Sequence, residues 1–451
     1  MTLAIVLVVL VAGSVLFHFL SPWWFTPIAS NWSSIDDTVS ITFWVTGIVF
    51  VAVNLFMAYC VVRYRHTKGK QAHYEPENKK LEWSLIGLTT VGIVAMLAPG
   101  LFVWANFVNP PENARLFEVV GQQWQWSYRF PGKDGVLGAV NTRHVSTTNP
   151  FGIDVDDAAG RDDIVVNNPV LHLPVGQPVK ALMRSKDVLH DFAVPQFRVK
   201  MDMVPGQVTY VWFTPTRIGT FEVLCQELCG IAHFAMRGLV VVESADNFQQ
   251  WLDSQPTFAL SQQHINTGDV AAGQTLYALC STCHGAQGQG DVAKHAPKLS
   301  GQSPAYLKRQ LEYFKNDMRG SHALDTFGQQ MVPMAATLDG AAAIDNVVAY
   351  IETLPDTAAN KTIKGDVQNG RALYTTCGVC HGARGQGNFM QGVPRLAGMD
   401  DWYMATQLNH FKTGVRGVHP ADAYGSQMRF MAAMLNDEQA LNDLLTYVNT
   451  L

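Results

Sequence analysis

Three long stretches without a charged side chain constrain the fold of this chain more than any other feature. Residues 3–20 are apolar apart from His18, and residues 41–62 and 83–108 carry no charge. A helix needs about 20 apolar residues to cross roughly 30 Å of hydrocarbon, and a backbone in lipid must satisfy its hydrogen bonds within the segment. Each stretch is therefore predicted to span a membrane, with the last two forming a helical hairpin within residues 38–110.

The connector between the second and third stretches is basic. It contains Arg63, Arg65, Lys68, Lys70, Lys79 and Lys80. By the positive-inside rule this connector is cytoplasmic, so everything after Val108 lies on the extracytoplasmic, periplasmic side of a bacterial inner membrane.

The first stretch, within residues 1–37, has two interpretations. It is either a retained membrane helix or a cleaved signal peptide. No Lys or Arg precedes it, and no convincing small-residue cleavage site follows it. These features favour a retained helix.

Charge and composition argue against a nucleic-acid partner. The net charge is only −5, charged residues make up 15% of the 451 residues, and the sequence has no Lys/Arg-rich run of the kind that follows phosphates. A chain of this length has room for about three domains.

The C-terminal part of the chain is an internal repeat with an offset of 97 residues. At this offset Cys280, Cys283, His284, Pro297, His322, Met331 and Tyr350 fall on Cys377, Cys380, His381, Pro394, His419, Met428 and Tyr447. Two tandem copies of one domain explain the pattern. We predict all-α domains over 268–357 and 363–451, with helices at 305–316, 343–354, 402–412 and 438–451.

Each copy begins with a C-x-x-C-H motif, the attachment signature of c-type haem. The two cysteines form thioethers to the haem vinyl groups, and the histidine supplies one axial nitrogen. Thioredoxin-like redox pairs and zinc sites also use C-x-x-C, but here the motif occurs twice, each time with a Met 47 residues beyond the His. We therefore predict two covalently bound haems c. Their protein ligands would be Cys280, Cys283 and His284 in the first copy and Cys377, Cys380 and His381 in the second.

The second axial ligand is expected to be a methionine thioether, which raises the haem potential. The candidates are Met331 and Met334 in the first copy and Met428, Met431 and Met434 in the second. Most methionines on helices are core filler, so the repeat register is the useful guide. Residues 331–335 and 428–432 superpose and resemble the distal-ligand segment of small di-haem cytochromes c, in which the first Met binds iron. The resemblance implies Met331 and Met428 as ligands, with Met334 and Met431 as alternatives.

Short apolar runs separated by Gly, Pro and Asn lie between the hairpin and the repeat. Strands are predicted at 165–175, 179–183, 207–213, 219–224 and 238–243. Residues 111–243 are thus expected to form a β-sandwich or barrel. The Gln-rich residues 244–267 are expected to be a linker.

A cluster of soft ligand side chains lies at the end of this β region. Cys225, Cys229, His233 and Met236 follow one another closely, and His190 lies upstream. Thiolates, imidazoles and a thioether suit copper, and cysteines four apart on a loop can direct both sulfurs at two bridged metals. A disulfide between the cysteines and a zinc ion bound by Cys, Cys and His remain alternatives on spacing alone.

The residues around this cluster resemble cytochrome c oxidase subunit II. The matching segments are 190–195 (HDFAVP), 199–202 (VKMD), 205–206 (PG) and the Cys/His/Met run, and the resemblance spans about residues 38–243. It implies a cupredoxin-like domain with a dinuclear CuA centre. The implied ligands are His190, Cys225, Cys229, His233, Met236 and the backbone carbonyl of Glu227. In the family the side chain of the matching Glu reaches a magnesium ion shared with subunit I, so Glu227 is expected there.

A further segment, 121–128 (GQQWQWSY), resembles the aromatic patch of the same family. The first Trp of that patch accepts electrons from cytochrome c, which implies this role for Trp124. Aromatic packing at a membrane–water boundary is the alternative. The sequence also departs from the family pattern. Glu82 directly precedes Trp83, which puts its role at a proton channel in doubt, and Gln122 stands where the family often has His.

Together these features predict a multi-domain membrane protein. It would have a transmembrane helical hairpin with an additional N-terminal helix, a cupredoxin-like β-sandwich and two all-α cytochrome c domains. The resemblance implies the subunit through which electrons enter a haem-copper terminal oxidase. Electrons from an extracytoplasmic donor would pass through two haems c to CuA and on to haem in subunit I, which reduces dioxygen to water.

The expected partners are oxidase subunit I, subunit III, the electron donor and the lipid membrane. The alternatives are a CuA-containing subunit of a nitric oxide reductase and a membrane-anchored electron carrier or redox sensor without a catalytic partner. Chain order gives the expectation that the Cys280 haem faces CuA and the Cys377 haem meets the donor. Lys298 and Arg395, which follow the shared proline, are candidates to neutralise haem propionates, or else solvated surface charges.

Overall fold

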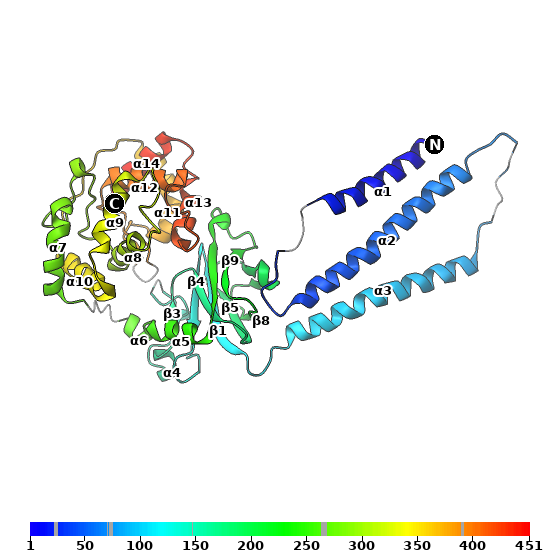
Figure 1. Ribbon diagram of the computed structural model, residues 1–451, viewed down its shortest axis with the longest axis horizontal. Helices are drawn as coiled ribbons and strands as arrows, with labels where there is room; N and C mark the ends of the chain where they lie inside the picture. The colour runs from blue at the N-terminus through cyan, green and yellow to red at the C-terminus, as the bar shows by residue number, and fades with distance from the viewer. Residues whose placement is uncertain (22–25, 70, 72–74, 147, 263–267, 389–391) are drawn as a thin grey trace.

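The computed structural model describes residues 1–451 except 22–25, 70, 72–74, 147, 263–267 and 389–391. Lys70 of the basic connector and the end of the predicted linker therefore lie outside the described residues. Figure 1 shows long N-terminal helices, then a β-domain, then a helical C-terminal region. This arrangement confirms the predicted multi-domain fold.

The described residues include three helices that are long and apolar enough to cross a membrane. They are α1 (Thr2–Leu20), α2 (Ser33–Arg63) and α3 (Lys79–Val108). Helix α1 packs on α2 through a small cluster of Ala4, Leu7 and Ala58, with Val61 packed against it. Most other side chains of these helices are exposed, as expected of a surface that faces lipid.

Polar contacts fix the β-domain to the ends of the long helices. Arg198 Nε lies 2.6 Å from Asp36 Oδ1 in the first turn of α2. The indole of Trp212 donates to the carbonyl of Asn106 in α3 at 3.0 Å, and its own carbonyl accepts from the Trp32 indole at 3.0 Å. The β-domain is therefore held at one end of the hairpin (Figure 1).

The β-domain is a sandwich of two sheets, each five-stranded among the described residues, with orders β3-β2-β1-β5-β8 and β4-β10-β9-β6-β7. Its strands are β1 (Arg115–Gln122), β2 (Gln125–Phe130), β3 (Ile164–Val166), β4 (Val170–Pro174), β5 (Val179–Ser185), β6 (His190–Val194), β7 (Val199–Met203), β8 (Thr209–Phe213), β9 (Gly219–Cys225) and β10 (Arg237–Glu243). Strand β1 runs parallel to β5, and β4 runs parallel to β10. Apolar side chains from both sheets form one core, which confirms the predicted sandwich.

The predicted strand over 165–175 is wrong in one respect, because it is two strands in different sheets. Strands β3 and β4 are separated by residues 167–169, where the Asn168 side chain accepts from the Val170 N–H at 2.9 Å. Proline at 169 cannot donate to a sheet ladder, so the chain leaves one sheet there and joins the other. The remaining predicted strands correspond to β5, β8, β9 and β10.

A buried ion network crosses the first sheet. Arg129, 1% exposed, donates from Nη1 to Glu118 Oε2 at 3.1 Å and from Nε to Asp163 Oδ2 at 2.9 Å. Its Nη2 also donates to the carbonyl of Gly138 at 2.6 Å. The guanidinium therefore ties β1 and β2 to the long loop that returns to β3.

The described part of the segment predicted as a linker is folded onto the sandwich. It forms α5 (Ala245–Ser254) and α6 (Phe258–Ser261), whose residues Phe248, Leu252 and Phe258 are buried. The Trp251 ring stacks on His172 of β4 with centroids 4.2 Å apart. Apolar positions three and four apart give α5 one buried face, so it belongs structurally to the β-domain.

The two C-terminal domains repeat one helical arrangement. The first contains α7 (Val270–His284), α8 (Pro304–Lys315), α9 (Thr326–Ala336) and α10 (Gly340–Thr353), and the second contains α11 (Val367–His381), α12 (Asp401–Thr413), α13 (Ala423–Ala432) and α14 (Glu438–Val448). The first and last helices of each domain cross at a glycine. A Cβ on Gly273 or Gly370 would lie 1.9 Å from a backbone oxygen of the crossing helix, so only glycine allows that approach.

We predict that Arg129→Gln destabilises the β-domain by about 3–5 kcal/mol, because it leaves the buried Asp163 carboxylate without its counter-charge and leaves Glu118 with Arg184 alone. Thermal unfolding followed by tryptophan fluorescence measures the loss. Lys133→Gln removes an exposed charge from the same domain and should change stability by no more than about 0.5 kcal/mol. Equal effects of the two variants would contradict the role given to the network.

Candidate metal and haem sites

The soft ligands predicted from the sequence converge at one end of the sandwich. Strand β9 ends at Cys225, β6 begins at His190, and the donor atoms of His190, Cys225 and Cys229 all lie within 4.8 Å of one another and are buried. The two sulfurs are 3.7 Å apart. Cys229 Sγ lies 3.5 Å from His233 Nδ1 and 3.8 Å from Met236 Sδ.

The Glu227 backbone completes this set. Its carbonyl oxygen lies 3.3 Å from Cys225 Sγ, so the backbone position expected to bind metal is at the cluster. The Glu227 carboxylate points elsewhere, with Oε1 3.4 Å from Lys200 Nζ. It is partly exposed, and the magnesium site stays a prediction.

Residues outside the cluster orient the His190 imidazole. Its Nε2 lies 2.8 Å from Asp187 Oδ1, and its Nδ1 faces Cys225 Sγ at 3.9 Å. A carboxylate on the far nitrogen fixes the tautomer that leaves the near nitrogen free to bind metal. Gly121 leaves room for the ring, since a Cβ there would lie 3.2 Å from it.

The donor set fits a pair of coppers better than either alternative. Both cysteines are free. The cluster offers two sulfurs, two imidazoles, a thioether and a carbonyl, which exceeds the four positions of a structural zinc site and suits soft copper. A proton shared between the two sulfurs lowers the pKa of Cys225 and raises the pKa of Cys229. One thiolate is therefore favoured before metal binds, and metal binding would release the second proton.

Both C-x-x-C-H histidines are oriented for an axial role. His284 Nδ1 lies 2.8 Å from the carbonyl of Pro297, and His381 Nδ1 lies 2.9 Å from the carbonyl of Pro394. Nε2 is therefore the nitrogen left free for iron in each ring. Burial lowers the pKa of both histidines, which favours the neutral imidazole that binds metal.

A cavity of about 540 Å³, lined mostly by apolar side chains, extends across both haem motifs. Met331 and Met428 line it, at equivalent positions of the repeat, whereas Met334 is not among the described lining residues. Met431 also lines the cavity and packs against the core of the sandwich. This arrangement supports the first methionine of each segment as the axial ligand.

The second cytochrome c domain lies directly against the β-domain at Trp124. The Trp124 side chain is 8% exposed and its indole donates to the carbonyl of Cys229 at 3.1 Å. Trp124 and Cys380 line the same cavity. Burial raises the pKa of the Cys380 thiol, and the Trp124 backbone opposes this effect. Trp124 thus lies between the metal cluster and the second haem motif.

Side chains of α13 extend this contact. The Phe430 and Phe234 rings meet edge to face with centroids 5.9 Å apart, and the Arg237 guanidinium lies 4.9 Å from the Phe430 centroid. Gln427 donates to the carbonyl of Arg237 at 2.9 Å. In Figure 1, α11 and α13 lie nearest the strands, and α7 and α10 lie on the far side.

The expectation that the first haem domain faces the metal cluster is therefore wrong. Sequence adjacency places the Cys280 motif next to the β-domain along the chain, yet the Cys377 motif makes the contact. The residues between α10 and α11 explain how this is possible. An extended chain spans at most about 3.3–3.6 Å per residue, so residues 354–366 are long enough to return the second domain to the sandwich.

The two cations proposed to neutralise propionates have other partners. Lys298 Nζ, 1% exposed, lies 2.6 Å from Asp356 Oδ1 and donates to the carbonyl of Gly398 at 2.8 Å. Arg395 Nη1 lies 2.7 Å from Asp356 Oδ2. Because Asp356 follows α10, these contacts join the first domain to the second. Neither the propionate nor the solvated interpretation describes Lys298.

Two residues that line the cavity, Arg319 and Arg416, were not predicted from the sequence. They fall on each other at the 97-residue offset, a signal that could have identified them. Arginine is common on protein surfaces, so the repeat alone does not show that both are buried.

Two family models match the chain. The model described as the periplasmic domain of cytochrome c oxidase subunit II matches residues 116–245. The model described as cytochrome c matches residues 270–355 and 367–451. The first match contains the soft-ligand cluster, and each part of the second contains one C-x-x-C-H motif.

Individual proteins resemble separate parts of the chain. An alternative cytochrome c oxidase subunit 2 of Bradyrhizobium diazoefficiens is 60% identical over 259 residues, covering 57% of this chain and 94% of that protein. A cytochrome c oxidase subunit 2 of Cereibacter sphaeroides is 29% identical, covering 51% of this chain and 77% of that protein. The crystal structure of reduced recombinant cytochrome c4 from Pseudomonas stutzeri is 29% identical, covering 41% of this chain and 100% of that one, with a TM-score of 0.34.

We predict that Asp187→Ala weakens copper binding by about 10- to 100-fold, because the His190 ring loses the group that orients it. Competition with a chelator, followed by the visible absorption of the copper centre, measures the affinity. Asp187→Asn is the matched control, since its amide oxygen can still accept from Nε2 and should retain most of the affinity. Equal losses in both variants would contradict an orienting role.

Proposed function

This chain belongs to the cytochrome c oxidase subunit II family, and we propose that it is the subunit through which electrons enter a haem-copper terminal oxidase. The cytochrome c domains fused to its C-terminus give the chain its own electron relay. Dioxygen reduction would take place in subunit I, since each haem motif here has candidates for both axial positions. The position of Trp124 between Cys229 and Cys380 is the observation that carries this proposal.

The residues that would hold the cofactors are those brought together above. His190, Cys225, Glu227, Cys229, His233 and Met236 would hold a dinuclear copper centre, and Cys280, Cys283, His284, Met331, Cys377, Cys380, His381 and Met428 would hold two haems c. When bound, these groups supply reversible one-electron chemistry. The chain's own contribution is to fix the imidazole tautomers, bury the sites and set the order in which the domains touch.

The domain contacts support an order of electron transfer opposite to chain order. The first cytochrome c domain would receive electrons from the donor, and the second would deliver them to the copper domain. In the first domain Cys283 is exposed, whereas its counterpart Cys380 is partly buried beside Trp124. The outer surface at Cys283 is therefore where an extracytoplasmic donor would approach.

Trp124 would accept electrons from the fused domain rather than from a separate protein. The second cytochrome c domain covers its side chain, so a soluble carrier has no direct access to it. The indole hydrogen bond to the Cys229 carbonyl then leads to a residue of the metal cluster. This contact explains why an aromatic residue that is 8% exposed lies at the junction of two domains.

An exposed apolar surface beside the metal cluster is available for the catalytic subunit. Leu228, 81% exposed, and Ile231 lie on the ligand loop, and exposed apolar groups beside a functional site mark contact surfaces. Glu227 lies on the same loop, in a position to share magnesium with subunit I. Subunit III would complete the complex, with α1, α2 and α3 in the inner membrane and the redox domains in the periplasm.

We predict that this chain holds two coppers and two haems c, in addition to the metals of the catalytic subunit, and that the purified complex consumes dioxygen rather than nitric oxide. Metal analysis, haem spectra and side-by-side assays with the two gases provide the measurement. Nitric oxide consumption with a haem and non-haem-iron subunit would identify a nitric oxide reductase instead. Zinc in the cluster, or a complex without any catalytic subunit, would contradict the proposal.

We predict that Met428→His lowers the potential of the second haem, because a thioether ligand raises haem potentials relative to imidazole. Donor-driven reduction of the first haem should be unchanged, while reduction of copper slows. Rapid-mixing spectroscopy separates the two events, and small artificial donors should still reduce copper directly.

Met331→His is the matched control for this order. It should lower the potential of the first haem and slow electron uptake at that haem itself. A redox titration in which Met428→His shifts neither haem would contradict the ligand assignment. Slower reduction of the first haem in Met428→His would contradict the proposed order.

A further inference from the structure

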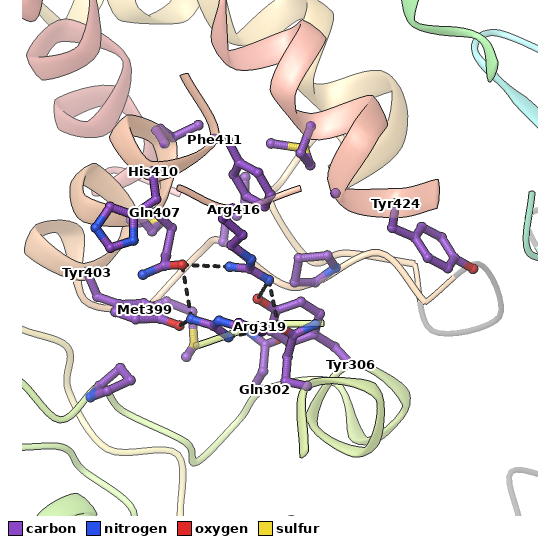
Figure 2. Close-up of a pocket in the computed structure, with 18 of the residues that line it drawn as sticks. Gln302, Tyr306, Arg319, Met399, Tyr403, Gln407, His410, Phe411, Arg416 and Tyr424 are labelled. Atoms are coloured by element: carbon purple, nitrogen blue, oxygen red, sulfur yellow. Dashed lines mark hydrogen bonds between the residues drawn. The ribbon is translucent and has the colours of Figure 1, made fainter. Parts of the chain in front are cut away.

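A network of six side chains lies within the haem cavity, between the two cytochrome c domains (Figure 2). It contains three residues of each domain, related by the repeat offset of 97 positions. The members are Tyr306, Gln310 and Arg319 of the first domain and Tyr403, Gln407 and Arg416 of the second.

Each arginine is bonded to both domains. Arg319 Nη1 donates to Gln310 of its own domain at 2.8 Å, and its Nη2 donates to Tyr403 at 2.6 Å and Gln407 at 3.0 Å in the other. Arg416 Nη1 donates to Gln407 at 2.7 Å, and its Nη2 donates to Gln310 at 2.6 Å and Tyr306 at 3.3 Å. Each glutamine oxygen therefore accepts from both guanidinium groups.

The two positive charges are buried with no carboxylate among their hydrogen-bond acceptors in the described residues. Burial raises the pKa of the Tyr306 phenol, but the charges of Arg416 and Arg319 outweigh it and lower that pKa. Arg319 and Arg416 are each 7% exposed, and their recorded hydrogen-bond acceptors in the described part of the chain are amide and phenol oxygens. Arg319 Nε is buried with no hydrogen-bond partner among the described residues. Each guanidinium also lies over an aromatic ring of its own domain, Phe314 or Phe411, at 4.5 Å.

The nearby carboxylates are already used by the backbone. Asp325 accepts from Gly328 N at 3.0 Å at the start of α9, and Asp422 accepts from Gly425 N at 2.7 Å at the start of α13. Asp422 interacts electrostatically with Arg416 and also with Tyr313. Asp325 Oδ1 lies 3.8 Å from His410 Nδ1, and burial together with the two arginines lowers the pKa of that histidine. Buried charges without paired counter-ions are strongly unfavourable, so the cavity is built for further negative groups.

We propose that Arg319 and Arg416 form one shared binding site for propionates of both haems, so that the charge state at each haem influences the other. This inference rests on the haem sites of the proposed function. A guanidinium binds a carboxylate through two parallel hydrogen bonds, and the cavity that holds both haem motifs also holds both arginines.

Because Arg319 and Arg416 each form hydrogen bonds to both domains, each arginine is expected to influence both haems. Replacing either arginine removes a positive charge that contacts both domains, rather than a charge confined to one haem. A cation beside a haem disfavours the additional positive charge of ferric iron. Loss of either arginine should therefore lower the midpoint potentials of both haems.

The pairing also keeps the propionates ionised. An adjacent cation lowers a carboxyl pKa, so the potentials of the native protein should depend little on pH near neutrality. Without one arginine, a buried propionate should take up a proton at higher pH. The haem potentials of the variant should then fall as pH rises through the new pKa, because deprotonation adds negative charge that favours ferric iron.

The test is a spectroscopic redox titration of the intact complex at several pH values, with Arg319→Gln and Arg416→Gln compared with the parent protein. We expect both haem potentials to fall in each variant and to become pH-dependent. Arg371→Gln is the matched control, because it removes the same charge from an exposed position of the second domain and should shift neither haem. Arg416→Lys keeps the charge and should retain most of the parent potential, even where domain packing weakens.

Haem content is measured first, because it distinguishes a failure of the proposed function from a failure of this inference. A parent protein without two haems c would overturn the proposed function itself. Two bound haems with unchanged potentials in both Gln variants would overturn the inference alone. A shift confined to the haem of the mutated domain would overturn the shared site, and so would a loss of thermal stability without any change in potential.

Discussion

The contact of Trp124 with the second cytochrome c domain decides how the rest of the molecule is arranged. The Trp124 indole donates to the carbonyl of Cys229 in the metal cluster, and Trp124 lines the same cavity as Cys380 of a haem motif. Phe430 and Phe234 close the same interface. The second domain occupies this surface, and the first cytochrome c domain lies further from the copper domain, with Cys283 exposed.

The chain has two buried arginine networks, and they differ in whether the arginine charge is balanced by carboxylates. Arg129 in the β-domain is paired with Glu118 and Asp163 of the same domain, so its charge is balanced within the fold. Arg319 and Arg416 are held by amide and phenol groups in a cavity, with no carboxylate among their hydrogen-bond acceptors in the described part of the chain. A network that is complete without a ligand is a structural feature, whereas one that lacks counter-ions is suited to bind an anion.

The candidate ligand side chains could be identified because most of them are close in sequence. Cys225 to Met236 occupy one loop, each haem motif spans five residues, and the repeat register selected Met331 and Met428. Strands β1, β2, β6 and β7 were not predicted individually, because charged residues such as Arg129 and Asp191 interrupt their apolar pattern although both are buried. The partners of Lys298 were also hidden, because they lie 58 and 100 residues away along the chain.

The sequence by itself determined the membrane helices, the β-sandwich, the duplicated cytochrome c domains and the residue types at each redox site. These features follow from local composition, from the spacing of nearby residues and from a repeat with a constant offset, all of which can be read along the chain. Only the tertiary structure decided which cytochrome c domain meets the copper domain, how deeply Trp124 is buried and that Arg319 and Arg416 converge. Those outcomes depend on complementary surfaces between distant segments, and the connections between the domains are long enough to permit either order.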